Sequence, residues 1–100
     1  ILFIMRQGNG AVVLEQSYAK QIALLVDSAK PGMKISLNME KGIKIAEKNN
    51  VLDKMISINK NLVTVKLSEK GGYDYSFFNE VEVTSYRDQK DPNLYLFIVN

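Results

Sequence analysis

The sequence predicts an α+β fold in which one long N-terminal amphipathic helix packs on an antiparallel sheet of four to five strands, with a possible second short helix. Apolar residues recur at helical spacing over residues 11–29, and short apolar runs separated by turn residues fill the second half of the chain. The length of 100 residues, with 46% hydrophobic and 24% charged residues, suits one globular domain. We therefore expect residues 11–100 to form a single α+β domain.

The predicted helix at residues 11–29 has a wide apolar face. This face consists of Leu14, Tyr18, Ile22, Leu25 and Ala29, widened by Val12, Ala19, Ala23 and Val26. We expect the helix to bury Tyr18, Ile22, Leu25 and Val26 against the sheet, because nothing else in the chain offers an apolar face of that width. Val13 and Leu24 lie on the polar side instead, which indicates a second contact or an oligomer surface.

The remaining elements are predicted from alternation and turn residues. Residues 33–39 alternate apolar and polar side chains, as a strand with one solvent-exposed face does. Residues 40–50 suit either a short helix or the return arm of a hairpin, and the Glu, Lys and Ala content favours the helix. The further predicted strands are residues 55–58, 62–67, 73–78, 81–86 and 94–99, of which the last is a nearly continuous apolar run expected to be covered on both faces.

Residues 1–10 begin with five apolar residues, followed by Arg6 and a Gly-Asn-Gly break. This order is typical of the last turn of a membrane-spanning helix where it meets water, so we interpret residues 1–10 as the remnant of a membrane anchor or, alternatively, as an N-terminal strand. The candidate interaction residues are the apolar positions that one helix packed on one sheet cannot all cover: Ile1, Leu2, Phe3, Ile4, Met5, Val13 and Leu24.

Charge is nearly balanced over the whole chain, with a formal net charge of +2, so a polyanion partner for the whole molecule is not indicated. The distribution is uneven, because residues 30–70 hold nine Lys against four acidic residues and residues 71–100 have a sum of −3. Antiparallel pairing of the two segments is expected to cancel much of this difference.

The residue types available for catalysis are few. The chain has no Cys and no His, which removes the thiolate nucleophile, the imidazole base and the commonest transition-metal ligands. Asp88, Asp91 and Asn93 lack the glycine and the terminal Glu of a calcium loop, so we expect a turn with Asx hydrogen bonds there. We predict no catalytic residues, no cofactor and no metal; an enzyme with an Asp/Lys/Tyr site is the alternative.

Four aromatic residues lie close together next to the lysine-rich middle of the chain, as in some single-stranded nucleic-acid binders. In a strand, Tyr73, Tyr75 and Phe77 share one face and Phe78 lies on the other, so at least some of them are expected to be core residues. A nucleic-acid-binding module is therefore an alternative class, and we expect no nucleic-acid partner.

Two stretches, YAKQIALLVDSAKPG at residues 18–32 and GGYDYSFF at residues 71–78, resemble small, uncharacterised archaeal proteins with a single N-terminal membrane span and an extracytoplasmic α+β domain. The resemblance covers nearly the whole chain and includes no catalytic motif. It implies an anchored domain on the outer face of the cell envelope.

We therefore predict a non-catalytic interaction or assembly domain of a membrane-anchored cell-envelope protein. It is expected to bind a protein partner or a second copy of itself, and to reach the membrane through its N-terminal apolar segment. The layout also resembles the plan of a pilin-like subunit, so a filament subunit is the alternative.

Overall fold

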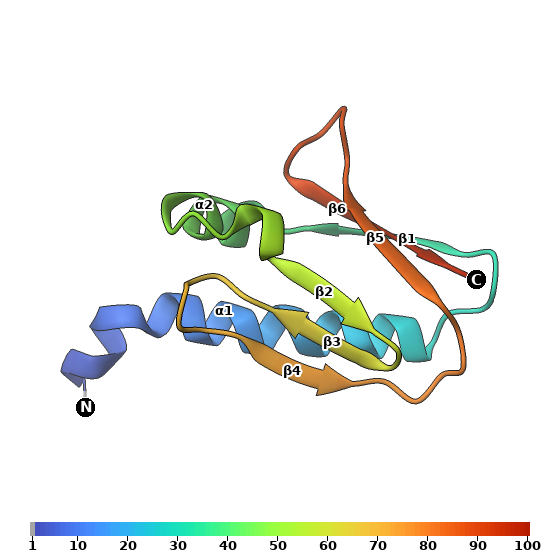
Figure 1. The fold of residues 1–100 in the computed structure, drawn as a ribbon, viewed down its shortest axis with the longest axis horizontal. Coiled ribbons are helices and arrows are strands. Elements are labelled where there is room, and N and C mark those ends of the chain that lie inside the picture. Colours follow the sequence, from blue (N-terminus) through green and yellow to red (C-terminus); the bar gives the residue numbers. More distant parts are fainter. Residues whose placement is uncertain (1) are drawn as a thin grey trace.

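A computed structural model has the predicted α+β class, with two α-helices and two antiparallel three-stranded sheets (Figure 1). It describes residues 2–100, and side chains from Ala11 onward. The elements, in chain order, are α1 (Leu2–Asp27), β1 (Lys34–Asn38), α2 (Glu40–Lys48), the 3-10 helix η1 (Leu52–Lys54), β2 (Ile56–Asn59), β3 (Leu62–Val65), β4 (Tyr73–Ser76), β5 (Val83–Arg87) and β6 (Leu94–Val99).

The prediction of one sheet with four to five strands is wrong, because the six strands form two sheets with the orders β1-β6-β5 and β2-β3-β4. In the first sheet, Phe97 lies opposite Ile35 on one side and Ser85 on the other. The sheets are separate because β4 and β5 do not pair: the segment between them is held at the end of α1 by side-chain hydrogen bonds from Asn79. The two sheets contact each other where β2 meets β5.

The local predictions after residue 33 are largely confirmed. Residues 34–38 form β1 with alternating burial, and residues 40–48 form helix α2 rather than a hairpin arm. The turn between β2 and β3 has Lys60 in the left-handed region, with a φ of 57°. β6 is the central strand of its sheet, but only alternate residues are fully buried, so the expectation that both faces are covered is met on one face alone.

Helix α1 begins at Leu2, nine residues before the predicted start, so the alternative of an N-terminal strand does not apply to residues 2–10. Figure 1 shows α1 running along the β2-β3-β4 sheet. Tyr18, Ile22 and Val26 are buried, as predicted. The prediction for Leu25 is wrong, because its side chain is 40% exposed.

The buried face of α1 is rotated relative to the predicted one because it includes small residues and one acid. Ala19 and Ala23 are fully buried, and Glu15 is buried at 3% exposure. Glu15, three residues before Tyr18, lies on the same face of the helix as Tyr18, Ile22 and Val26. Leu25 lies at the edge of this buried face. The core cluster joins this face to residues of both sheets and of α2: Met39, Ile43, Ala46, Val51, Met55, Val63, Val65, Leu67, Phe77, Tyr95 and Phe97.

Tyr18 joins α1 to the start of α2. The N-cap residue of α2, Met39, provides no side-chain hydrogen bond, but the hydroxyl oxygen of Tyr18 accepts a hydrogen bond of 3.2 Å from the backbone N–H of Gly42. A first-turn N–H that has no partner within its own helix is thereby satisfied. Burial raises the pKa of Tyr18 above 10.0, and the hydrogen bond from Gly42 opposes this shift. Above pH 10 the unfolded chain releases the phenol proton of Tyr18 more readily than the folded chain does. The free energy of unfolding therefore decreases as the pH rises above 10.

Glu15 joins the same part of α1 to the segment between β3 and β4. Its Oε2 atom accepts a hydrogen bond of 2.8 Å from the backbone N–H of Leu67. Gly71 approaches the same carboxylate so closely that a Cβ atom at this position would clash with it. The buried carboxylate therefore fixes the β3–β4 segment on the helix.

We predict that Tyr18→Phe destabilises the protein by about 1–3 kcal/mol, because it leaves the buried N–H of Gly42 without its acceptor. Chemical denaturation monitored by circular dichroism measures the change. The control is Tyr86→Phe, which removes a hydroxyl from a side chain that is 43% exposed and should leave the midpoint nearly unchanged. Equal midpoints for the two variants would contradict the assigned role of Tyr18.

We also predict that Ile22→Ala and Leu25→Ala differ in cost. Ile22 is 1% exposed, so its truncation leaves a cavity and should cost about 2–5 kcal/mol. Leu25 is 40% exposed, so its truncation should cost about 1 kcal/mol or less. The free energy of unfolding of both variants, measured in urea, checks the orientation of α1; a larger loss for Leu25→Ala would mean that the buried face is assigned wrongly.

Candidate interaction surface

Helix α1 carries most of the large exposed apolar side chains, and two of them lie on the face away from the sheets. Among the described side chains, seven large hydrophobic ones are exposed, and four of them belong to α1. Val13 is 54% exposed and Leu24 is 61% exposed. The structure therefore places these two sequence-predicted residues on the surface of the same helix, as the prediction of a second contact requires.

Val13 and Leu24 belong to one line along α1. With Ser17 and Lys20 they follow the spacing of four, three and four residues that the seam of a helix pair has. The two apolar positions are eleven residues apart in number, which corresponds to about 16 Å along a helix. Between them the surface is polar, and the side-chain amide of Gln21 donates a hydrogen bond of 2.9 Å to the hydroxyl of Ser17. We call this line, residues 13, 17, 20 and 24, the α1 seam.

The other predicted interaction residues are described only in part. Ile1 lies outside the described residues. Leu2, Phe3, Ile4 and Met5 belong to α1, but their side chains lie outside the described ones. The helix that carries the α1 seam is therefore continuous with this apolar segment. Within residues 2–100, none of the helices combines the length and the apolarity that crossing a bilayer requires.

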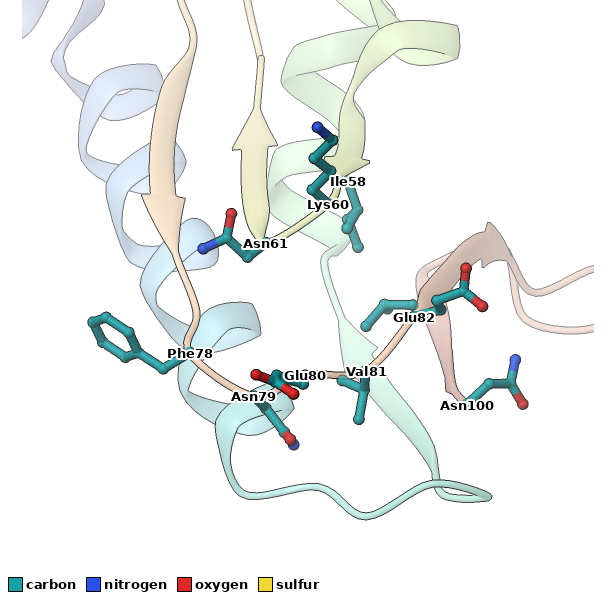
Figure 2. Close-up of a pocket in the computed structure, with 10 residues that line it drawn as sticks. Ile58, Lys60, Asn61, Phe78, Asn79, Glu80, Val81, Glu82 and Asn100 are labelled. Atoms are coloured by element: carbon teal, nitrogen blue, oxygen red, sulfur yellow. The ribbon is translucent and has the colours of Figure 1, made fainter.

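Phe78 is an exposed aromatic residue that the sequence reasoning did not select. Its side chain is 86% exposed, while the preceding Phe77 is fully buried. Figure 2 shows the Phe78 ring pointing away from the groove beside it. The alternation of a strand that ends at this point could have identified the exposed position, because Tyr73, Tyr75 and Phe77 were already assigned to the opposite face.

The backbone around Phe78 is fixed to the end of α1. The carboxylate of Asp27 accepts hydrogen bonds from the backbone N–H groups of Phe78 and Asn79, at 2.6 and 2.9 Å. The side-chain amide of Asn79 donates to the carbonyl oxygens of Val26 and Ala29, at 2.9 and 2.7 Å. These carbonyls are at the helix C-terminus, where the backbone lacks internal partners. The exposed ring is thus presented on a segment with a defined backbone.

The groove beside Phe78 lies between the β2–β3 turn and the segment that leads into β5 (Figure 2). Its volume is about 850 Å³, and its apolar lining includes Ile58 and Val81. Lys60 on one side is opposed by Glu80 and Glu82 on the other. All three charges are on exposed residues, so this groove has the polar character of an ordinary surface depression.

A second groove, between η1 and β5, contains Asp and Tyr residues of the alternative enzyme hypothesis, with an arginine and, among the described residues, no lysine in its lining. Glu47, Asp53, Arg87 and Tyr95 all line it. Burial raises the pKa of Tyr95 above 10.0, and the positive charge of Arg87 only opposes this shift. The phenol is therefore protonated at neutral pH and is a poor general base. The guanidinium of Arg87 is also engaged, since its Nε atom donates to the carbonyl oxygen of Pro92 at 2.6 Å.

Two further expectations can be compared with the structure. The Asx turn is confirmed, because the carboxylates of Asp88 and Asp91 accept hydrogen bonds from the backbone N–H groups of Lys90 and Asn93. The aromatic group divides as the strand pattern predicted: Tyr73 and Tyr75 stack with ring centroids 6.5 Å apart and pack against the core. A continuous aromatic platform beside the lysines is therefore not formed by these residues.

No protein-family model matches the chain, and neither curated proteins nor solved structures gave a match.

Proposed function

We propose that this chain is a non-catalytic assembly domain of a membrane-anchored cell-envelope protein, and that it binds a second copy of itself through the α1 seam. The observation that carries the proposal is that Val13 and Leu24, two large exposed hydrophobic side chains, lie on the face of α1 opposite the one that fills the core. Apolar residues 1–5 provide the membrane attachment, and residues 2–5 of this segment lie on the same helix.

A second copy fits the α1 seam better than an unrelated partner does because the seam has the periodicity of paired helices. Val13 and Leu24 have the spacing of core positions in such a pair, and the polar residues between them limit its stability. The contact buries only part of the surface of two apolar side chains per copy. Each Å² of apolar surface removed from water stabilises the pair by about 25 cal/mol. Self-association in free solution is therefore expected to be weak.

Attachment to a membrane compensates for this weakness. Two copies held on one surface meet at a much higher effective concentration than two copies in solution, as do two linked binding modules. In that arrangement the helices run side by side, with their N-terminal segments in the same membrane. A weak seam is then sufficient for assembly, and its weakness allows the assembly to be reversible.

The test compares Val13→Gln/Leu24→Gln with a matched control, Val12→Gln/Leu25→Gln. All four residues are large, exposed and on α1, but the control pair lies outside the α1 seam. We predict that the seam variant weakens self-association of the full chain about tenfold or more, because four apolar side chains per dimer are replaced. Energy transfer between labelled copies in vesicles measures this association.

The control variant should associate as the unaltered chain does. Equal loss in both variants, or in neither, would reject the α1 seam as the contact. Sedimentation in detergent distinguishes the alternative of a filament subunit, because a filament grows without a fixed size whereas a helix pair closes at two copies. Deletion of residues 1–5 tests the attachment: it should remove binding to vesicles and leave a folded domain.

A further inference from the structure

We propose that the end of the domain beside the start of α1 carries a lysine surface that binds anionic lipid headgroups. We call it the basal surface; it consists of Lys44 and Lys48 of α2 and Lys70 of the β3–β4 segment. The inference rests on the proposed membrane attachment and adds to it the lipid class and the face of the domain that contacts the membrane.

Hydrogen bonds bring three separate segments together at this end. The side-chain amide of Asn49, just after α2, donates to the carbonyl oxygen of Leu67 at 2.8 Å. The backbone N–H of Leu67 in turn donates to Glu15 of α1. The end of α2, the β3–β4 segment and the middle of α1 around Glu15 therefore form one structural unit, and Figure 1 shows α2 and the β3–β4 segment on the side of the molecule toward the N-terminus of α1.

The lysines of this unit are available to a partner. Gly42, Ile43 and Ala46 form the buried face of α2, which leaves its lysines on the outside. The side chain of Lys44 is 73% exposed and forms a solvent-exposed ion pair with Glu40 at 3.4 Å, and Lys48 and Lys70 are exposed as well. Lys66 has a different role, because its ammonium group donates to the carbonyl oxygens of Glu69 and Gly71 and so shapes the loop.

The basal end keeps an excess of positive charge after its acids are counted. Residues 40–48 and 66–70 contain five Lys and three Glu, and with the buried Glu15 of α1 the excess is +1. At the other end of α1, the groove of Figure 2 is lined by Lys60 together with Glu80 and Glu82, so two acidic residues outnumber one lysine there.

An anionic lipid surface is the partner that fits this end best. Apolar residues 1–5 and Arg6 precede the unit in the sequence, and an apolar segment combined with basic residues is the usual two-part membrane attachment. A single-stranded nucleic acid would require stacking aromatic residues beside the lysines. Tyr73 and Tyr75 instead pack against the core, and Phe78 lies at the far end of α1, beside Asp27.

The experiment measures binding of the full chain to phosphatidylcholine vesicles with and without phosphatidylglycerol. We compare Lys44→Gln/Lys48→Gln/Lys70→Gln with the control Lys30→Gln/Lys34→Gln/Lys60→Gln, which removes the same charge from exposed lysines away from the basal surface. Both variants change the formal net charge from +2 to −1. Each lysine near an anionic surface adds to the attraction, so we expect the basal variant to bind anionic vesicles at least tenfold more weakly.

The control variant should retain most of its binding, and the difference between the variants should vanish in high salt. Equal loss in both variants, or no dependence on phosphatidylglycerol, would overturn the inference. Retention of a single-stranded oligonucleotide that only the basal variant loses, without any preference for anionic vesicles, would assign the surface to nucleic acid instead. Binding to neutral vesicles reports on residues 1–5 alone, so failure of the anchor is distinguished from failure of the basal surface.

Discussion

The architecture depends on the attachment of one face of α1 to the rest of the chain by polar contacts at both of its ends. Near the N-terminal end of this face, Glu15 and Tyr18 accept backbone hydrogen bonds from the β3–β4 segment and from α2. At the C-terminal end, Asp27 accepts hydrogen bonds from the β4–β5 segment. Between these ends the contacts are apolar and close, because Ala19 and Ala23 bring the backbones together. The helix is thereby fixed in rotation as well as in position.

A fixed rotation determines which residues are left outside. Because Glu15 is part of the buried face, Val13 and Leu24 are turned to the surface and Leu25 to its edge. Large aliphatic side chains on a fixed helix cannot move into the core, so they are either tolerated in water or covered by another molecule. The proposed assembly through the α1 seam and the packing of the core are therefore two consequences of the same orientation.

The sequence predicted the parts of the fold that depend on local patterns. Alternation identified β1, turn residues separated β2 from β3, and Glu, Lys and Ala indicated the helix at α2. Two features had no local signal. Glu15 has no apolar character that would place it on the buried face, and its partner, Leu67, is brought to it only by the fold. Asn79 resembles any loop asparagine, yet its bonds to α1 direct the chain from one sheet to the other.

One of the two candidate surfaces could be predicted from local sequence patterns, and the other depends on contacts between distant segments. Val13 and Leu24 could be selected from helical spacing alone, whereas the basal surface requires Asn49 and Leu67 to meet. Phe78 is fixed beside Asp27. Asp27 follows Glu15 by twelve residues, which corresponds to about 18 Å along α1. If the basal surface rests on lipid, this exposed aromatic ring is held well away from the membrane, on a backbone that α1 itself positions. One helix then sets the distance between the end that contacts the membrane and the end that a further partner can reach.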